Sequence, residues 1–136
     1  MTQVIIFTND NGGVSTCIPT GELSIEQVKQ KDTPAGSIIV NASDLPNQYN
    51  DFYDAWEIVA GKVQVNKAKA VDITKKRLRV EREPLLAAQD VLFQRALESS
   101  GDTAAIVAEK NRLRDITNQA TESLTLEALR ALKAGV

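Results

Sequence analysis

The longest regular pattern of apolar residues in the chain runs through residues 67–99. Within it Val71, Leu78, Leu85 and Leu92 recur every seven residues, which is the spacing of one face of a helix. The segment is also rich in Ala, Leu, Lys, Arg and Glu, which favour the helical state. We therefore expect one long helix, with a charged first half and an apolar second half that forms the core of a helical hairpin.

A second amphipathic segment, residues 103–119, follows after a very short link. Gly101 is placed to end the first helix in a left-handed conformation, and Asp102 or Thr103 to cap the second. A link this short requires the two helices to be antiparallel. The chain should end with a third, short helix at 126–133, with Thr125 as its N-cap. The residues expected to be buried together in the hairpin core are Leu85, Leu92, Ile106 and Leu113.

The first 66 residues follow a different pattern, in which short β-branched runs alternate with turn residues. Ser24 and Gln27 form a capping-box pattern that predicts a short helix over 25–32. The segment at 37–41 is expected to be a third strand, and the unbroken apolar run within it, Ile-Ile-Val, indicates a central position. The remaining expected elements are strands at 4–8, 14–18, 56–59 and 62–66 and a helical turn at 50–55.

Together these elements predict an α+β protein with two parts. Residues 1–66 form a head unit with a small, mostly antiparallel sheet and one short helix, and residues 67–136 form a helical strut and hairpin with a short C-terminal helix. Charge supports a boundary near Asn66, because the first part holds eight acidic and three basic residues, net −5, whereas the second holds ten acidic and thirteen basic residues, net +3. No apolar run approaches the ~20 residues that span a bilayer.

Candidate chemistry is sparse. The chain has one cysteine, Cys17, and no histidine, so an internal disulfide is excluded, a zinc site is nearly excluded and the usual general base is missing. The Asn-Asp-Asn-Gly-Gly loop at 9–13 is better explained as a hairpin turn than as a cation loop. Asp51, Asp54 and Glu57 fit a solvated acidic face better than a magnesium site. We expect no catalytic residue, no metal and no cofactor.

The basic run at Lys75, Lys76, Arg77, Arg79 and Arg82 raises the question of phosphate contacts. Glu81 and Glu83 are interleaved with it, and no aromatic residue lies nearby. A charged helix surface, or the flank of a coiled coil, explains the run better than nucleic-acid binding does.

The strut also lacks an obvious cover within the chain. The second helix has about 17 residues against about 33 in the first, so near half of the first helix lies beyond its reach. The expected exposed seam, available for self-association or docking, consists of Val71, Lys75, Leu78 and Arg82. The head unit folding back over the strut is the alternative. Pro84 lies inside the long helix and should kink or split it.

Two motifs of the helical part are specific. One runs from Arg77 to Glu83 and continues through Leu86, Asp90, Phe93 and Ala-Leu-Glu at 96–98, and the other is Leu-Arg-Asp-Ile at 113–116. These motifs resemble those of a family of small proteins encoded among the tail genes of tailed bacteriophages. Many relatives have proline after the last motif, whereas this chain has Thr117, so we expect its second helix to continue further.

The resemblance covers essentially the whole chain and implies a tail or tail-assembly protein without catalytic residues. The implied partners are other tail or tail-fibre proteins and further copies of the chain, with no nucleic acid, membrane or small-molecule substrate. A dimer and a trimer both remain open. The implied location is the virion tail, or the host cytoplasm during assembly. The alternative role is an assembly chaperone that shields a tail protein and then leaves.

Overall fold

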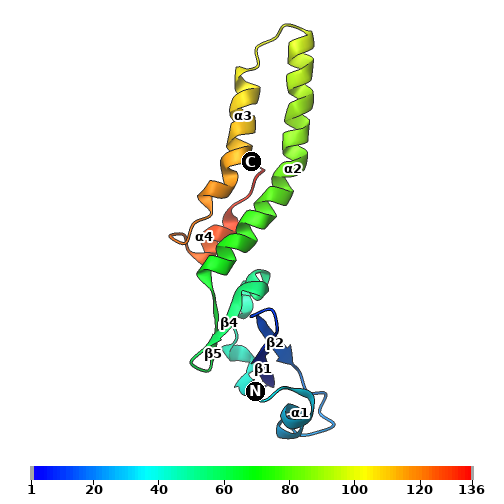
Figure 1. Ribbon diagram of the computed structural model, residues 1–136, viewed down its shortest axis with the longest axis vertical. Helices are drawn as coiled ribbons and strands as arrows, with labels where there is room; N and C mark the ends of the chain where they lie inside the picture. Colours follow the sequence, from blue (N-terminus) through cyan, green and yellow to red (C-terminus); the bar gives the residue numbers. More distant parts are fainter. Residues whose placement is uncertain (1, 136) are drawn as a thin grey trace. The chain divides into compact units, whose positions relative to one another are not determined.

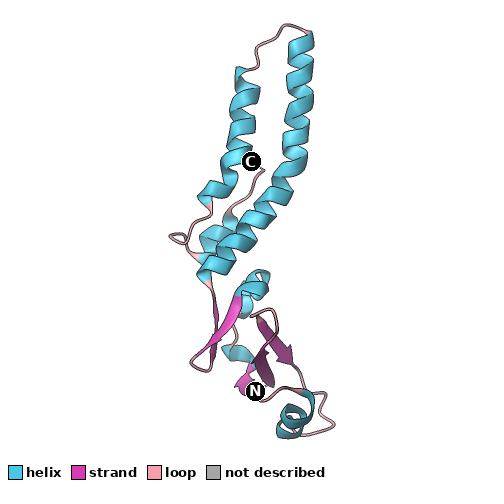
Figure 2. Ribbon diagram, viewed as in Figure 1, coloured by secondary structure: helices cyan, strands magenta, loops and turns pink. Residues whose placement is uncertain are grey.

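The computed structural model describes residues 2–135, which divide into two units between Ala70 and Val71. The first unit contains the strands and the second contains most of the helical residues, so the predicted α+β class and the order of its elements are confirmed. Figure 1 labels the elements along the chain, and Figure 2 shows strands in the first unit and helices throughout the second.

The first unit holds two antiparallel sheets. The larger has the strand order β2-β1-β3, with β1 (Gln3–Thr8) between β2 (Val14–Cys17) and β3 (Ile38–Asn41). The smaller is a hairpin of β4 (Trp56–Val59) and β5 (Lys62–Val65). The prediction that the third strand is central is wrong: β1 pairs with both neighbours, and β3 lies at an edge.

Three short helical segments connect these strands. They are α1 (Ile25–Asp32), the 3₁₀ helix η1 (Ala42–Asp44) and the 3₁₀ helix η2 (Asn47–Ala55). The predicted capping box is confirmed, since Ser24 accepts a hydrogen bond from the N–H of Gln27 and the Gln27 side chain accepts one from the N–H of Ser24. Local sequence chemistry therefore fixes where α1 begins.

The core of the first unit lies between the sheets. Its buried members are Val4, Ile6, Val14 and Trp56. The indole N–H of Trp56 donates to the carbonyl of Tyr49 at 3.3 Å, so this large side chain is buried without an unsatisfied donor.

The 9–13 loop is a hairpin turn, as expected. The Asn9 side-chain oxygen accepts hydrogen bonds from the N–H groups of Asn11 and Gly13, each at 3.0 Å. This is the local role that asparagine commonly plays in turns.

The second unit is built on α2 (Lys67–Glu98), whose first four residues belong to the first unit. It is followed by α3 (Ala104–Asp115), the 3₁₀ helix η3 (Ile116–Gln119) and α4 (Leu126–Ala131). Figure 1 shows α2 and α3 running antiparallel as a hairpin. The predicted Thr125 cap is confirmed by its hydrogen bond from the N–H of Ala128 at 3.0 Å. The second helix does not remain α-helical to residue 119, because its last turn tightens to 3₁₀ at Ile116.

Pro84 bends α2 without splitting it. The helix is continuous through Pro84 and changes direction near its middle (Figure 1). Proline has no N–H for the carbonyl of Val80, and its ring crowds that carbonyl, which is the usual cause of such a bend.

The end of α2 corrects one prediction. Gly101 does not take the left-handed conformation; Ser100 does, with φ of 59°. The N–H of Gly101 donates to the carbonyl of Ala96 at 2.7 Å, and the N–H of Ser100 donates to that of Leu97 at 3.2 Å. This pair of bonds is a Schellman motif with serine at the left-handed position. Thr103 is the N-cap of α3, as one of the two predicted alternatives, but its side chain makes no capping hydrogen bond. Asp102, one residue earlier, instead accepts from the N–H of Ala104 at 2.9 Å.

Candidate interaction surface

The predicted exposed seam on the first half of α2 is buried. Leu78 is 0% exposed and Val71 is 7% exposed, while Lys75 and Arg82 are half-buried. The prediction that these four residues form a free surface is therefore wrong. The prediction compared only the lengths of the first two helices, and it did not foresee that the C-terminal part of the chain covers α2. In the structure α4 and the C-terminal segment pack against α2, and the guanidinium of Arg77 donates to the carbonyl of Leu129 at 3.1 Å.

Side chains of two helices, α2 and α3, bind the C-terminal segment at Ala134. The N–H of Ala134 donates to the carboxylate of Glu81 on α2 at 3.1 Å, and its carbonyl accepts from Arg112 on α3 at 3.0 Å. Arg77 completes the arrangement through an ion pair with Glu81 at 2.6 Å. We call Arg77, Glu81, Arg112 and Ala134 the C-terminal clasp. Figure 1 shows the segment after α4 lying between α2 and α3.

Electrostatics support the clasp. Burial alone would raise the pKa of Glu81, but the N–H of Ala134 and the guanidinium of Arg77 outweigh it and hold the pKa below 4.5. Hydrogen bonds from Arg112 likewise lower the pKa of Glu109, through a two-point contact at 2.6 and 2.9 Å. Both carboxylates are thus stabilised in their charged form.

Arg82, another member of the basic run, ties α2 to the end of α3. Its guanidinium donates to the carbonyl of Arg114 at 2.7 Å and to that of Leu113 at 3.4 Å. Carbonyls in the last turn of a helix lack partners within the helix and attract cations. Arg77 and Arg82 therefore have structural roles, because each binds backbone carbonyls of another segment.

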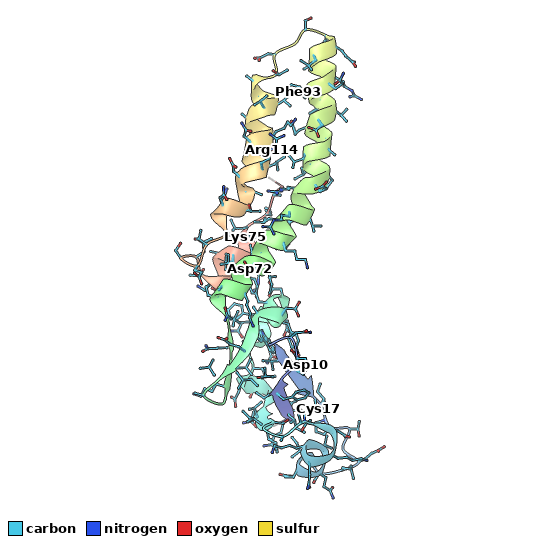
Figure 3. All side chains as sticks on the ribbon, in the orientation of Figure 1. Asp10, Cys17, Asp72, Lys75, Phe93 and Arg114 are labelled. Atoms are coloured by element: carbon cyan, nitrogen blue, oxygen red, sulfur yellow. The ribbon has the colours of Figure 1, made fainter. Side chains whose placement is uncertain are left out.

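The predicted hairpin core is only partly correct. Leu113 is buried and Leu85 and Ile106 are half-buried, but Leu92 is 45% exposed. Phe93 takes the inward position instead. The ammonium of Lys110 lies 5.1 Å from the centre of the Phe93 ring and forms an ion pair with Asp90 at 2.6 Å, which links α3 to α2. Phe93 is labelled on α2 in Figure 3.

A second set of exposed apolar side chains lies on the other face of α2. Val80 is 70% exposed and Val91 is 50% exposed, and Pro84 and Ala87 between them are also exposed. At 3.6 residues per turn these four fall within about 60° of the helix circumference. We call Val80, Pro84, Ala87 and Val91 the outer stripe.

The outer stripe was not predicted, although its spacing can be read from the sequence. Its residues follow one another at intervals of four, three and four, which is the spacing of core positions in a coiled coil. The same helix thus carries two apolar stripes. Only the longer, inward-facing stripe was predicted, although the spacing of the shorter one is also present in the sequence.

The remaining candidates do not form sites. Within residues 2–135, no group of three or more acidic or cysteine side chains is placed to bind a metal. Glu57, one of the three acids considered for magnesium, instead accepts hydrogen bonds from Gln64 and Asn66, and these lower its pKa. In the same described part of the chain, no helix combines the length and apolar character needed to cross a bilayer.

No protein-family model, no curated protein and no solved structure matches the chain.

Proposed function

We propose that the protein is a non-enzymatic structural or adaptor protein of a bacteriophage tail, acting by self-association or by docking to tail or tail-fibre components. The phage setting rests on the resemblance of the motifs at 77–98 and 113–116. The mode of action rests on one observation, the exposure of the outer stripe.

The outer stripe is suited to receive a helix. Val80 and Val91 supply apolar area at its two ends, and Ala87 near its middle allows a second backbone to approach closely. Apolar residues at coiled-coil spacing along one exposed face are typical of a surface that packs against another helix. The occupant is a helix of a second copy or of a neighbouring tail protein.

A charge-introducing variant tests this role. Val80→Glu combined with Val91→Glu should leave the fold intact, since both side chains point to solvent, but it should prevent packing of a second helix. Sedimentation velocity should then show a shift from oligomer to monomer, with unchanged helicity by circular dichroism. Ala108→Glu, at an exposed position of α3, is the matched control. Equal association of wild type, control and double variant would argue against the outer stripe as a self-association surface.

Assembly chaperone activity is the second candidate, because the exposed outer stripe would also suit transient shielding of a tail protein. Mass spectrometry of purified phage particles separates the two roles. A structural component should be retained in stoichiometric amounts relative to other tail proteins, whereas a chaperone should be present during assembly and missing from the finished particle.

A further inference from the structure

The edge strand β3 combines a sequence suited to a sheet interior with a position at a sheet border. Its first three residues, Ile-Ile-Val, form an apolar run of the kind found in strands with neighbours on both sides, and Asn41 ends the strand. In residues 2–135, β1 is its only paired strand. Edge strands are usually protected by lysine, proline or a bulge, and the four residues of β3 include neither lysine nor proline.

The pairing pattern shows which backbone groups of β3 face outward. The N–H of Ala42 donates to the carbonyl of Thr2 at 2.8 Å, so this opposed pair is hydrogen-bonded. Bonded and non-bonded pairs alternate along an antiparallel ladder. Val40 therefore directs its N–H and carbonyl toward β1, whereas Ile39 and Asn41 direct theirs away from it. The pairing of β1 with β2 is consistent with this assignment. Asn9 and Gly13 form a hydrogen-bonded pair, so the β1 backbone groups that do not face β3 are directed toward β2.

Two outward-facing residues with one residue between them can pair with the same two residues of a second, antiparallel copy. If Ile39 lies opposite Asn41 of a second copy, and Asn41 opposite Ile39, four backbone hydrogen bonds form around a two-fold axis. Two of them use the second lone pair of the Asn41 carbonyl, because this carbonyl also accepts the first bond of η1. We propose that β3 pairs in this register with β3 of a second copy, which joins two three-stranded sheets into one of six strands. This pairing does not depend on the outer stripe.

The surroundings of Val40 leave space for this arrangement. The side chain of Val40 packs beside the core cluster of the first unit, and the axis would place it against Val40 of the second copy. A surface cavity of about 460 Å³, lined by Val40, Leu45, Gly61 and Val63 among others, lies on this face. A second cavity of about 530 Å³ includes Ile39 in its lining. Successive side chains of a strand point to opposite faces of the sheet, so a cavity lies beside β3 on each face.

The second copy is favoured over an unrelated strand because the chain itself supplies every required feature. It has the outward-facing groups at the correct spacing, and it has an apolar residue at the axis, where cross-strand contact between β-branched side chains is favourable. Four paired residues bury less than the ~1,000 Å² of a stable interface, so we expect the dimer to be weak. It should form only as the protein concentration approaches about 1 mM, or at the high local concentration of an assembly.

A disulfide tests the register directly. In a Cys17→Ser background, Val40→Cys should form a covalent dimer under air oxidation, because opposed non-bonded residues lie about 4.5 Å apart at Cα, within the range that a disulfide spans. Ile39→Cys is the matched control and should cross-link poorly, since it faces Asn41 of the second copy. Equal yields from the two variants, or none from Val40→Cys, would overturn the register.

A proline substitution tests the pairing while leaving the three apolar side chains of β3 in place. Asn41 has φ of −75°, which proline accepts, and its N–H faces away from β1. Asn41→Pro should therefore fold normally but lose two of the four inter-copy bonds, weakening the dimer about tenfold or more. Asn41→Ala keeps the N–H and should dimerise like wild type. A wild type that remains monomeric at about 1 mM, or an Asn41→Pro dimer of undiminished affinity, would rule out the proposal.

Discussion

Ser100 occupies a backbone conformation that is costly for its residue type. Its φ of 59° lies in the left-handed region, where only glycine avoids a steric penalty of about 1 kcal/mol. Ser100→Gly should therefore raise the free energy of unfolding by about 0.5 to 1 kcal/mol, measured by urea denaturation.

Gly101 provides the matched control one residue further on. Its φ is not positive, and a Cβ there would lie 3.5 Å from the carbonyl oxygen of Ala96, an ordinary contact. Gly101→Ala should change stability by less than about 0.5 kcal/mol. A loss from Ser100→Gly together with a gain from Gly101→Ala would contradict this description of the turn.

The same two residues show what local sequence predicts at this scale. Gly101 correctly predicts the end of α2, because helices commonly end next to glycine. It does not indicate which of two neighbouring residues adopts the left-handed conformation. That choice depends on which carbonyls the N–H groups of Ser100 and Gly101 reach, and composition carries no information about it.

At the scale of elements, the exposure of Leu92 has a simple geometric cause. A straight helix has 3.6 residues per turn, so a strict seven-residue repeat drifts by about 20° each time around its surface. Across the three steps from Val71 to Leu92 the drift reaches about 60°. Phe93 then lies closer to the inward face, which explains its contact with Lys110.

This difference predicts opposite outcomes for two leucines in one helix. Leu78→Ala should destabilise the protein by about 2 to 5 kcal/mol, because the side chain is fully buried. Leu92→Ala should cost less than about 1 kcal/mol, because nearly half of that side chain is already in water. Denaturation at equal protein concentration measures both, and similar losses would mean that the inward face of α2 is assigned incorrectly.

Local signals predicted most elements, and longer-range packing caused the errors. The capping residues Ser24 and Thr125 fixed two helix starts because their hydrogen bonds reach only three residues along the chain. The edge position of β3 and the cover over Leu78 depend on pairing with distant segments. Periodicity reports which face of an element is apolar, but it does not report what covers that face.

At the scale of the chain, the helical unit is closed by its own C-terminal segment. Ala134 is bonded to Glu81, 53 residues earlier, and Leu129 to Arg77, 52 residues earlier. The first half of α2 thereby acquires the cover that α3 is too short to provide. The exposed outer stripe, to which we assign the proposed docking role, lies on the far side of the same helix.

The C-terminal clasp also predicts how stability depends on pH. The pKa of Glu81 is lowered in the folded protein, so its carboxylate adds stability above the ordinary value of 4.5, and this contribution is lost as pH falls through the lowered pKa. The free energy of unfolding should therefore decrease as pH falls from about 5 to about 3. Glu81→Gln should lose stability at pH 7, since the charged partner of Arg77 is gone, and should show a smaller decrease in acid.

Glu83→Gln is the control for this acid response. Glu83 is an exposed carboxylate two residues further along α2, so its replacement removes one charge and leaves the bonds to Ala134 and Arg77 in place. Thermal unfolding followed by circular dichroism at a series of pH values compares the three proteins. We expect wild type and Glu83→Gln to lose stability in parallel, with Glu81→Gln following a shallower curve. If Glu81→Gln instead follows the wild-type slope, the contact between Glu81 and Ala134 does not hold the C-terminal segment in solution.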